Sequence, residues 1–158
     1  MKTIIAIDPG ASGGIAVREY NGSTKAINMP ETYQDIYNTL YEICKQNIGD
    51  DLDFDFVCYL EDVGKGIPGQ SSKATASFAR HCGHLEMALY ALQIPIEKIL
   101  PSRWQKTLGI GKGSDCADKL EWKNKLKCKA QELYPQIKVT LKNADALLML
   151  HYAIEKEK

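Results

Sequence analysis

Three acidic residues lie where an active site at the edge of a sheet would place them. Asp8 ends an apolar run before a glycine-rich turn, Glu61 ends a second such run, and Asp145 lies near the start of an apolar C-terminal segment. Three converging carboxylates repel one another unless a cation neutralises them. Mg²⁺ or Mn²⁺ prefers carboxylate oxygens, and two such ions about 4 Å apart would support phosphodiester hydrolysis. Each carboxylate alone can also be structural, and Asp145 can simply be favoured by a helix dipole.

The elements that must position these residues predict one α/β domain over residues 1–158. β-Branched and apolar runs predict strands at 3–8, 15–19, 24–28, 54–61 and 96–100. Helical spacing of apolar residues predicts helices at 31–47, 73–92, 117–134 and 143–156. Three meandering strands followed by alternating helices and strands predict a five-stranded mixed sheet with helices on both faces.

The composition is that of an ordinary globular protein, with 44% hydrophobic residues and 20 basic residues against 20 acidic ones. No apolar run approaches the roughly 20 residues that span a bilayer, and the N-terminal run is too short for a secretory signal. Five cysteines lie scattered without a CxxC pair, which predicts reduced thiols and a cytoplasmic location. The segment 81–84 holds two histidines and a cysteine, a weak zinc signal without a distant ligand pair.

The net charge of zero hides an uneven distribution. Residues 1–62 hold four basic and eleven acidic residues, whereas residues 98–143 hold eleven basic and four acidic ones. Such asymmetry indicates an anionic partner for the basic part, unless its lysines only form a solvated helix face.

Four segments in order, IIAIDPGASGGIAV, VCYLEDV, ILPSRWQKTLGIGKG and NADALLML, together resemble RuvC-type Holliday-junction resolvases, and the short chain resembles the phage-encoded branch. The resemblance runs from Ile4 to about Ala153. It implies an RNase H-like fold, a homodimer, and metal-dependent symmetric nicking of four-way DNA junctions. By position, Asp8, Glu61 and Asp145 match the family's metal-binding carboxylates.

One position departs from the family pattern. Where the family usually has an acidic residue or histidine three positions before the last aspartate, this chain has Lys142. Either three carboxylates and water suffice, or Asp62 or Asn143 substitutes. Our hypothesis is that Lys142 contacts the scissile phosphate or lowers metal affinity.

The resemblance and the charge map together supply candidates for DNA contact. We expect Ile67, in the loop after Glu61, to act as a wedge between bases or else to be an exposed loop residue. Lys106 is assigned a catalytic contact with phosphate, the alternative being a solvated surface lysine. The full set is Lys65, Ile67, Lys73, Arg103, Lys106, Lys112, Lys119, Lys123 and Lys142. Trp104 is either an aromatic nucleic-acid contact or a core residue, and helix 73–92, with its small residues, is either a dimer seam or packed on the sheet.

Other classes of function stay open. The segment GIGKGSD lacks the spacing of a phosphate-binding P-loop, and one domain is too small for an actin-like ATP fold, so no nucleotide cofactor is expected. The remaining alternatives are a non-catalytic module that binds branched DNA, and an RNase H-like nuclease for flaps or RNA–DNA hybrids.

Overall fold

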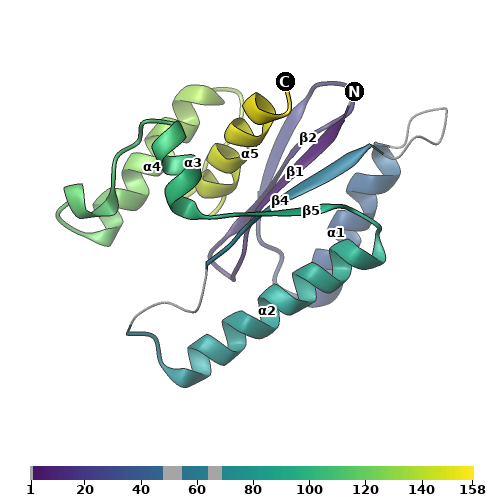
Figure 1. The fold of residues 1–158 in the computed structure, drawn as a ribbon, viewed down its shortest axis with the longest axis horizontal. Coiled ribbons are helices and arrows are strands. Elements are labelled where there is room, and N and C mark those ends of the chain that lie inside the picture. Colours follow the sequence, from purple (N-terminus) through teal and green to yellow (C-terminus); the bar gives the residue numbers. More distant parts are fainter. Residues whose placement is uncertain (1, 48–54, 64–68) are drawn as a thin grey trace.

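The computed structural model describes residues 2–47, 55–63 and 69–158, in which strands and helices combine in an α/β fold (Figure 1). Its elements are β1 (Thr3–Asp8), β2 (Gly14–Arg18), β3 (Thr24–Asn28), α1 (Tyr33–Gln46), β4 (Phe56–Glu61), α2 (Ser72–Ala91), β5 (Ile96–Ile99), α3 (Pro101–Thr107), the 3₁₀ turn η1 (Gly113–Asp115), α4 (Lys119–Leu133) and α5 (Ala144–Lys156). None of the helices in these ranges is long and apolar enough to cross a bilayer.

The five strands form one mixed sheet in the order β3-β2-β1-β4-β5, as the sequence predicts. β1 pairs antiparallel with β2, and β2 pairs antiparallel with β3. β4 pairs parallel with both β1 and β5. The central strand β1 is buried along its whole length because it has a neighbour on each side and helices over both faces.

Helices cover both faces of the sheet, and alternate residues of β1 point into two separate cores. Ile4 and Ala6 pack with the layer of α3, α4 and α5, whereas Ile5 and Ile7 pack with the layer of α1 and α2. Figure 1 shows these two layers on opposite sides of the strands. Because strand side chains alternate between faces, the register of β1 is strongly specified by both cores.

Helix α5 is the most deeply buried helix of the described structure, and its start lies against β2. Every residue from Ala144 to Leu150 is buried. A Cβ atom at Gly14 would lie only 2.9 Å from the Cα atom of Asn143, so only glycine permits this close approach. The approach places the N-terminal end of α5 beside the strands of the sheet.

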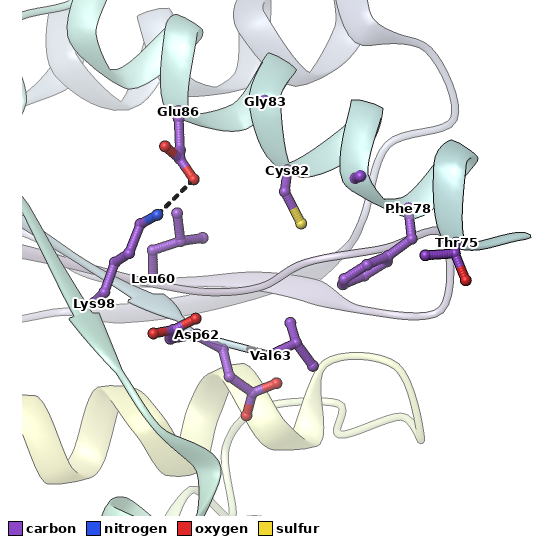
Figure 2. A pocket seen from close by; sticks show the side chains of 11 residues that line it. Leu60, Asp62, Val63, Thr75, Phe78, Cys82, Gly83, Glu86 and Lys98 are labelled. Atoms are coloured by element: carbon purple, nitrogen blue, oxygen red, sulfur yellow. Dashed lines mark ion pairs between the residues drawn. The ribbon is translucent and has the colours of Figure 1, made fainter. Parts of the chain in front are cut away.

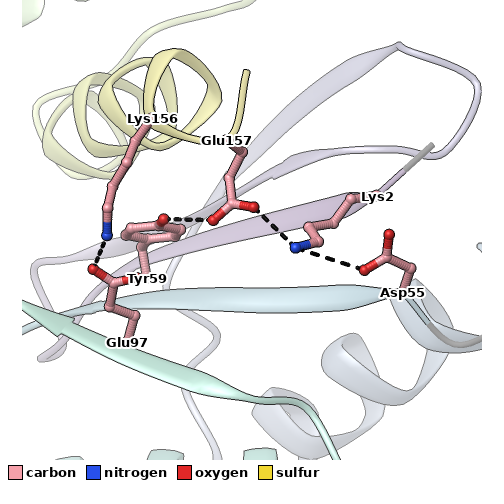
Figure 3. Close-up of polar contacts among 6 residues, drawn as sticks. All are labelled: Lys2, Asp55, Tyr59, Glu97, Lys156 and Glu157. Atoms are coloured by element: carbon pink, nitrogen blue, oxygen red, sulfur yellow. Dashed lines mark hydrogen bonds and ion pairs between the residues drawn. The ribbon is translucent and has the colours of Figure 1, made fainter.

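A polar network ties the other end of α5 to the sheet (Figure 3). Glu157 accepts hydrogen bonds from the Tyr59 hydroxyl at 2.7 Å and from the Lys2 Nζ atom at 2.9 Å. Lys156 pairs with Glu97, and its Nζ atom lies 5.2 Å from the centre of the Tyr59 ring. The helix that carries Asp145 at its start is therefore anchored to β4, β5 and the N-terminal segment at its end.

Helix α2 is long but mostly exposed. Of its 20 residues only Leu85 and Leu89 are buried, and its N-terminal half projects beyond the sheet (Figure 1). The C-terminal half therefore packs on the sheet, whereas the half with the small residues Ala76 and Ala79 does not.

Two short helical elements were not expected from the sequence. Pro101 was expected only to end the fifth strand, but it also begins α3, where its missing N–H group costs nothing. The 3₁₀ turn η1 interrupts the stretch between the glycine-rich loop and α4.

Candidate active site

Asp8 and Glu61 are brought together because they end neighbouring parallel strands. The register pairs Ile7 of β1 with Leu60 of β4, so the residue after each lies at the same edge of the sheet. Burial, followed by the charges of Glu61 and Asp145, raises the pKa of Asp8 well above its usual range. Burial and the Asp145 charge raise the pKa of Glu61 to about 6, while hydrogen bonding by Trp104 and Asp8 opposes this rise.

Asp145, the second residue of α5, is the third member of this cluster. Its side chain is only 10% exposed, and its charge acts on both Asp8 and Glu61. The Oδ2 atom accepts a hydrogen bond from the Lys123 Nζ atom at 2.5 Å. The Oδ1 atom is buried and has no hydrogen-bond partner among the residues that the structure describes. A buried carboxylate oxygen without a partner is costly, and a cation is the simplest group to satisfy it.

Trp104 supports the cluster from α3. Its ring is fully buried, and its Nε1 atom donates a hydrogen bond to the Glu61 Oε1 atom at 3.2 Å. The sequence left two interpretations open for Trp104, and the structure shows that it is a core residue. The contact with Glu61 was not foreseen, and the available signal was Pro101 three residues earlier, at the first position of a helix.

Lys123 lies inside the cluster rather than on an open surface. Burial disfavours its charge, but the charges of Asp145, Asp8 and Glu61 outweigh this and raise its pKa. The ammonium group in turn opposes the rise in the pKa of Asp8 and Glu61. The sequence singled out Lys123 for phosphate contact only. Its spacing of three and seven residues from the buried Leu126 and Ala130 marks the inward face of α4.

The other predicted DNA contacts are exposed or lie outside the described residues. Five are exposed on α2, on α3, before η1 and at the start of α4, namely Lys73, Arg103, Lys106, Lys112 and Lys119. Lys65 and Ile67 fall in the range 64–68, outside the described residues.

Lys142 is exposed in the turn before α5, so it does not precede Asp145 on the same helix. It lines a hollow with Ala11, Asn28 and His81. Its backbone N–H donates to the Thr140 hydroxyl. The hypothesis that Lys142 contacts the scissile phosphate stays a prediction.

A cavity of about 420 Å³ adjoins the cluster between the end of β4, β5 and α2 (Figure 2). Glu61 lines it together with the apolar side chains of Val63 and Phe78, and an ion pair of 2.8 Å joins Lys98 to Glu86 at its wall. The Cys82 thiol points toward this space in Figure 2. The Glu61 carboxylate itself meets Trp104 of α3, whereas this cavity is lined mainly by α2 and by the ends of β4 and β5.

The cluster suits a divalent cation by its chemistry but is not a preformed metal cage. Within the described ranges, no three His, Cys, Asp or Glu side chains are arranged to hold a metal ion as they stand. This holds for the 81–84 segment as well, where the His84 ring instead stacks on Tyr33 at 3.9 Å. The carboxylate cluster nevertheless offers only oxygen ligands, a buried unpartnered oxygen on Asp145, and raised pKa values that a cation would lower.

Comparison with known proteins finds similarity at the level of structure. No family model matches the sequence, and no curated protein matches it. RuvC from Thermus thermophilus, solved in complex with a Holliday junction substrate, is 13% identical with a TM-score of 0.58, over 98% of this chain and 96% of that chain. A second Thermus thermophilus RuvC structure is 15% identical with a TM-score of 0.53 over the same shares. The chain therefore has a RuvC-like, RNase H-like fold, as the sequence predicts.

Proposed function

We propose that this chain is a metal-dependent endonuclease that nicks four-way DNA junctions. The observation that carries the proposal is the buried cluster of Asp8, Glu61 and Asp145 at the ends of β1 and β4 and the start of α5, on a RuvC-like fold. A structural role alone would not account for three mutually repelling carboxylates at one edge of the sheet. Assignment to the phage-encoded branch rests on the sequence resemblance alone and stays a prediction.

Each residue of the cluster has a distinct role in this mechanism. Asp8, Glu61 and Asp145 would hold a divalent cation, Mg²⁺ or Mn²⁺, which when bound supplies an activated water and stabilises the leaving oxygen. Trp104 fixes the orientation of Glu61 through its hydrogen bond. Burial of the cluster strengthens every electrostatic interaction inside it, so small displacements of these side chains would reduce the rate strongly.

The exposed cations would position the DNA around the cluster. Arg103 and Lys106 lie on α3, whose Trp104 touches Glu61, so phosphate contacts there would fall near the carboxylates. Contacts of this kind read the backbone and shape of a junction rather than its bases. We therefore propose weak sequence preference and binding that weakens steeply as salt rises.

We further propose that two copies act together through α2. Its exposed half carries Ala76 and Ala79, which allow close helix approach, and its other half exposes Met87 and Tyr90 at 64% and 63%. A twofold axis would place two clusters symmetrically on a junction with two equivalent strands. Sedimentation across a range of protein concentrations tests this proposal, and a monomer at every concentration that still makes paired nicks would contradict it.

The proposed function is tested with labelled four-way junction, Y-fork, linear duplex and RNA–DNA hybrid, each in Mg²⁺, Mn²⁺ or EDTA. We expect paired symmetric nicks in the junction with either metal and none in EDTA. Asp8→Asn should abolish nicking while retaining junction binding, whereas Asp55→Asn, an exposed aspartate that pairs with Lys2, should nick like the wild type.

Three other results would favour a different function or exclude this active site. Binding without nicking in any metal would favour a non-catalytic module for branched DNA. Preferred cleavage of the RNA–DNA hybrid or of the fork would favour an RNase H-like nuclease of another specificity. Nicking by Asp8→Asn at the wild-type rate would exclude the carboxylate cluster as the active site.

A further inference from the structure

Lys123 places a positive charge among three carboxylates that would otherwise be neutralised only by metal. Its Nζ atom lies 2.5 Å from the Asp145 Oδ2 atom, and its side chain is 29% exposed beside an aspartate that is 10% exposed. Its charge acts on Asp8 and Glu61 as well as on its direct partner. A lysine on an open surface would not place its ammonium group in hydrogen-bond contact with a buried aspartate.

The charges of the cluster set how many divalent ions it can take. Because carboxyl groups must be ionised to bind a cation, the metal-binding form of the cluster has three carboxylates and one ammonium. These carry a formal charge of −2, which one divalent ion balances. Two divalent ions in the DNA-free protein would instead leave this buried group with +2. Uncompensated charge in a buried site is strongly unfavourable, so the balance favours a single ion.

The hydrogen bond from Lys123 occupies one of the two oxygens of Asp145. One of its oxygens, Oδ2, is taken by the lysine, and the other, Oδ1, is buried without a partner in the described part of the chain. This aspartate therefore has one oxygen left for an ion.

We propose that the DNA-free protein binds one divalent ion at this cluster, and that the Lys123 ammonium holds the place and charge of a second. The inference rests on the proposal that the cluster is a metal site. It concerns the DNA-free protein, and the two ions expected from the sequence for the reaction stay a prediction. Lys123 would be a resident cation that holds Asp145 aligned before the ion arrives.

The test is the stoichiometry of Mn²⁺ binding without DNA, measured by calorimetry and by the electron paramagnetic resonance of bound ion. We expect one ion per chain in the wild type and none in Asp8→Asn. Lys123→Met should bind a second ion, or bind the first at least about tenfold more tightly, because a positive charge a few ångströms away is removed. Lys129→Met removes a lysine from the same helix that pairs with Glu132 instead, and it should behave as the wild type.

Each other result would overturn the inference. These results are two ions or none in the wild type, unchanged stoichiometry and affinity in Lys123→Met, or an ion that persists in Asp8→Asn. Circular dichroism and the variant Lys123→Gln separate a changed site from a misfolded one. Junction nicking is measured separately. If the protein does not nick junctions but binds one ion in the wild type and two in Lys123→Met, the nuclease proposal fails and the metal inference stands.

Discussion

Replacing Glu61 with glutamine should stabilise the metal-free protein at neutral pH while it disables the proposed nuclease. The pKa of Glu61 is raised to about 6, first by burial and then by the charge of Asp145. The ionised side chain is therefore unfavourable in the folded state. Glutamine is neutral, has nearly the same shape, and retains an oxygen that can accept the hydrogen bond from Trp104.

The size and sign of the effect follow from the two pKa values. The folded value of about 6 against the ordinary 4.5 corresponds to about 2 kcal/mol of lost stability. Because the folded pKa is the higher one, the folded state holds the proton more tightly. The penalty is therefore small below pH 4.5, grows between pH 4.5 and 6, and is complete above that range. Glu61→Gln should gain about 2 kcal/mol at pH 7.5 and much less at pH 4.5.

The assay is urea unfolding in EDTA at pH 4.5 and pH 7.5, followed by circular dichroism. The matched control is Glu42→Gln, because Glu42 is exposed on α1 and its contact with Lys45 is 3.9 Å long. Adding Mg²⁺ should then stabilise the wild type more than Glu61→Gln, since a ligand that binds only the folded state stabilises it. A loss of stability in Glu61→Gln at pH 7.5, or a gain that does not change with pH, would refute the reasoning.

Two substitutions separate the site from the scaffold. Trp104→Phe removes the hydrogen bond to Glu61 and part of a fully buried side chain; unfolding in urea should show a loss of about 2 kcal/mol, and the junction-nicking rate should fall. An unchanged nicking rate in folded protein would show that the bond does not orient Glu61. Tyr59→Phe removes only the bond to Glu157 at the other end of α5, which should cost about 1 kcal/mol in the same unfolding assay. Its nicking rate should equal that of the wild type, and a large decrease would place the Tyr59 network within the mechanism.

The strands and long helices were predictable because local chemistry and tertiary packing agree there. The first strand, TIIAID, is bounded by Pro9 and observed over the residues predicted, since a β-branched apolar run suits a strand buried on both faces. The long helices begin and end within two residues of the predicted limits. Thr32 and Asp118 cap the first turns of two of them. The proximity of Asp8 and Glu61 was predictable because strand ends followed by glycine-rich loops lie at one edge of a parallel pair.

The remaining parts of the site depended on packing that periodicity does not report. Helix α3 spans only seven residues and begins with a proline that also ends a strand, so Pro101 fitted two interpretations. Lys123 belongs to a lysine-rich helix whose apolar pattern is weak, and its inward direction depends on the packing of α4 against α5. The partner of each residue, Glu61 for Trp104 and Asp145 for Lys123, comes from a distant part of the chain.

The acidic part and the basic part of the chain both contribute residues to this cluster. The acidic N-terminal part supplies Asp8 and Glu61, and the basic segment supplies Lys123, which is bound to an aspartate just beyond it. Burial, together with like charges held this closely, disfavours the charged carboxylates of the metal-free fold and raises the pKa of the two strand-end carboxyls. The fold tolerates this because its central strand and its last helix are buried along most of their length and anchored far from the cluster. A site strained in this way binds a cation more strongly than relaxed carboxylates would, because the cation relieves the repulsion.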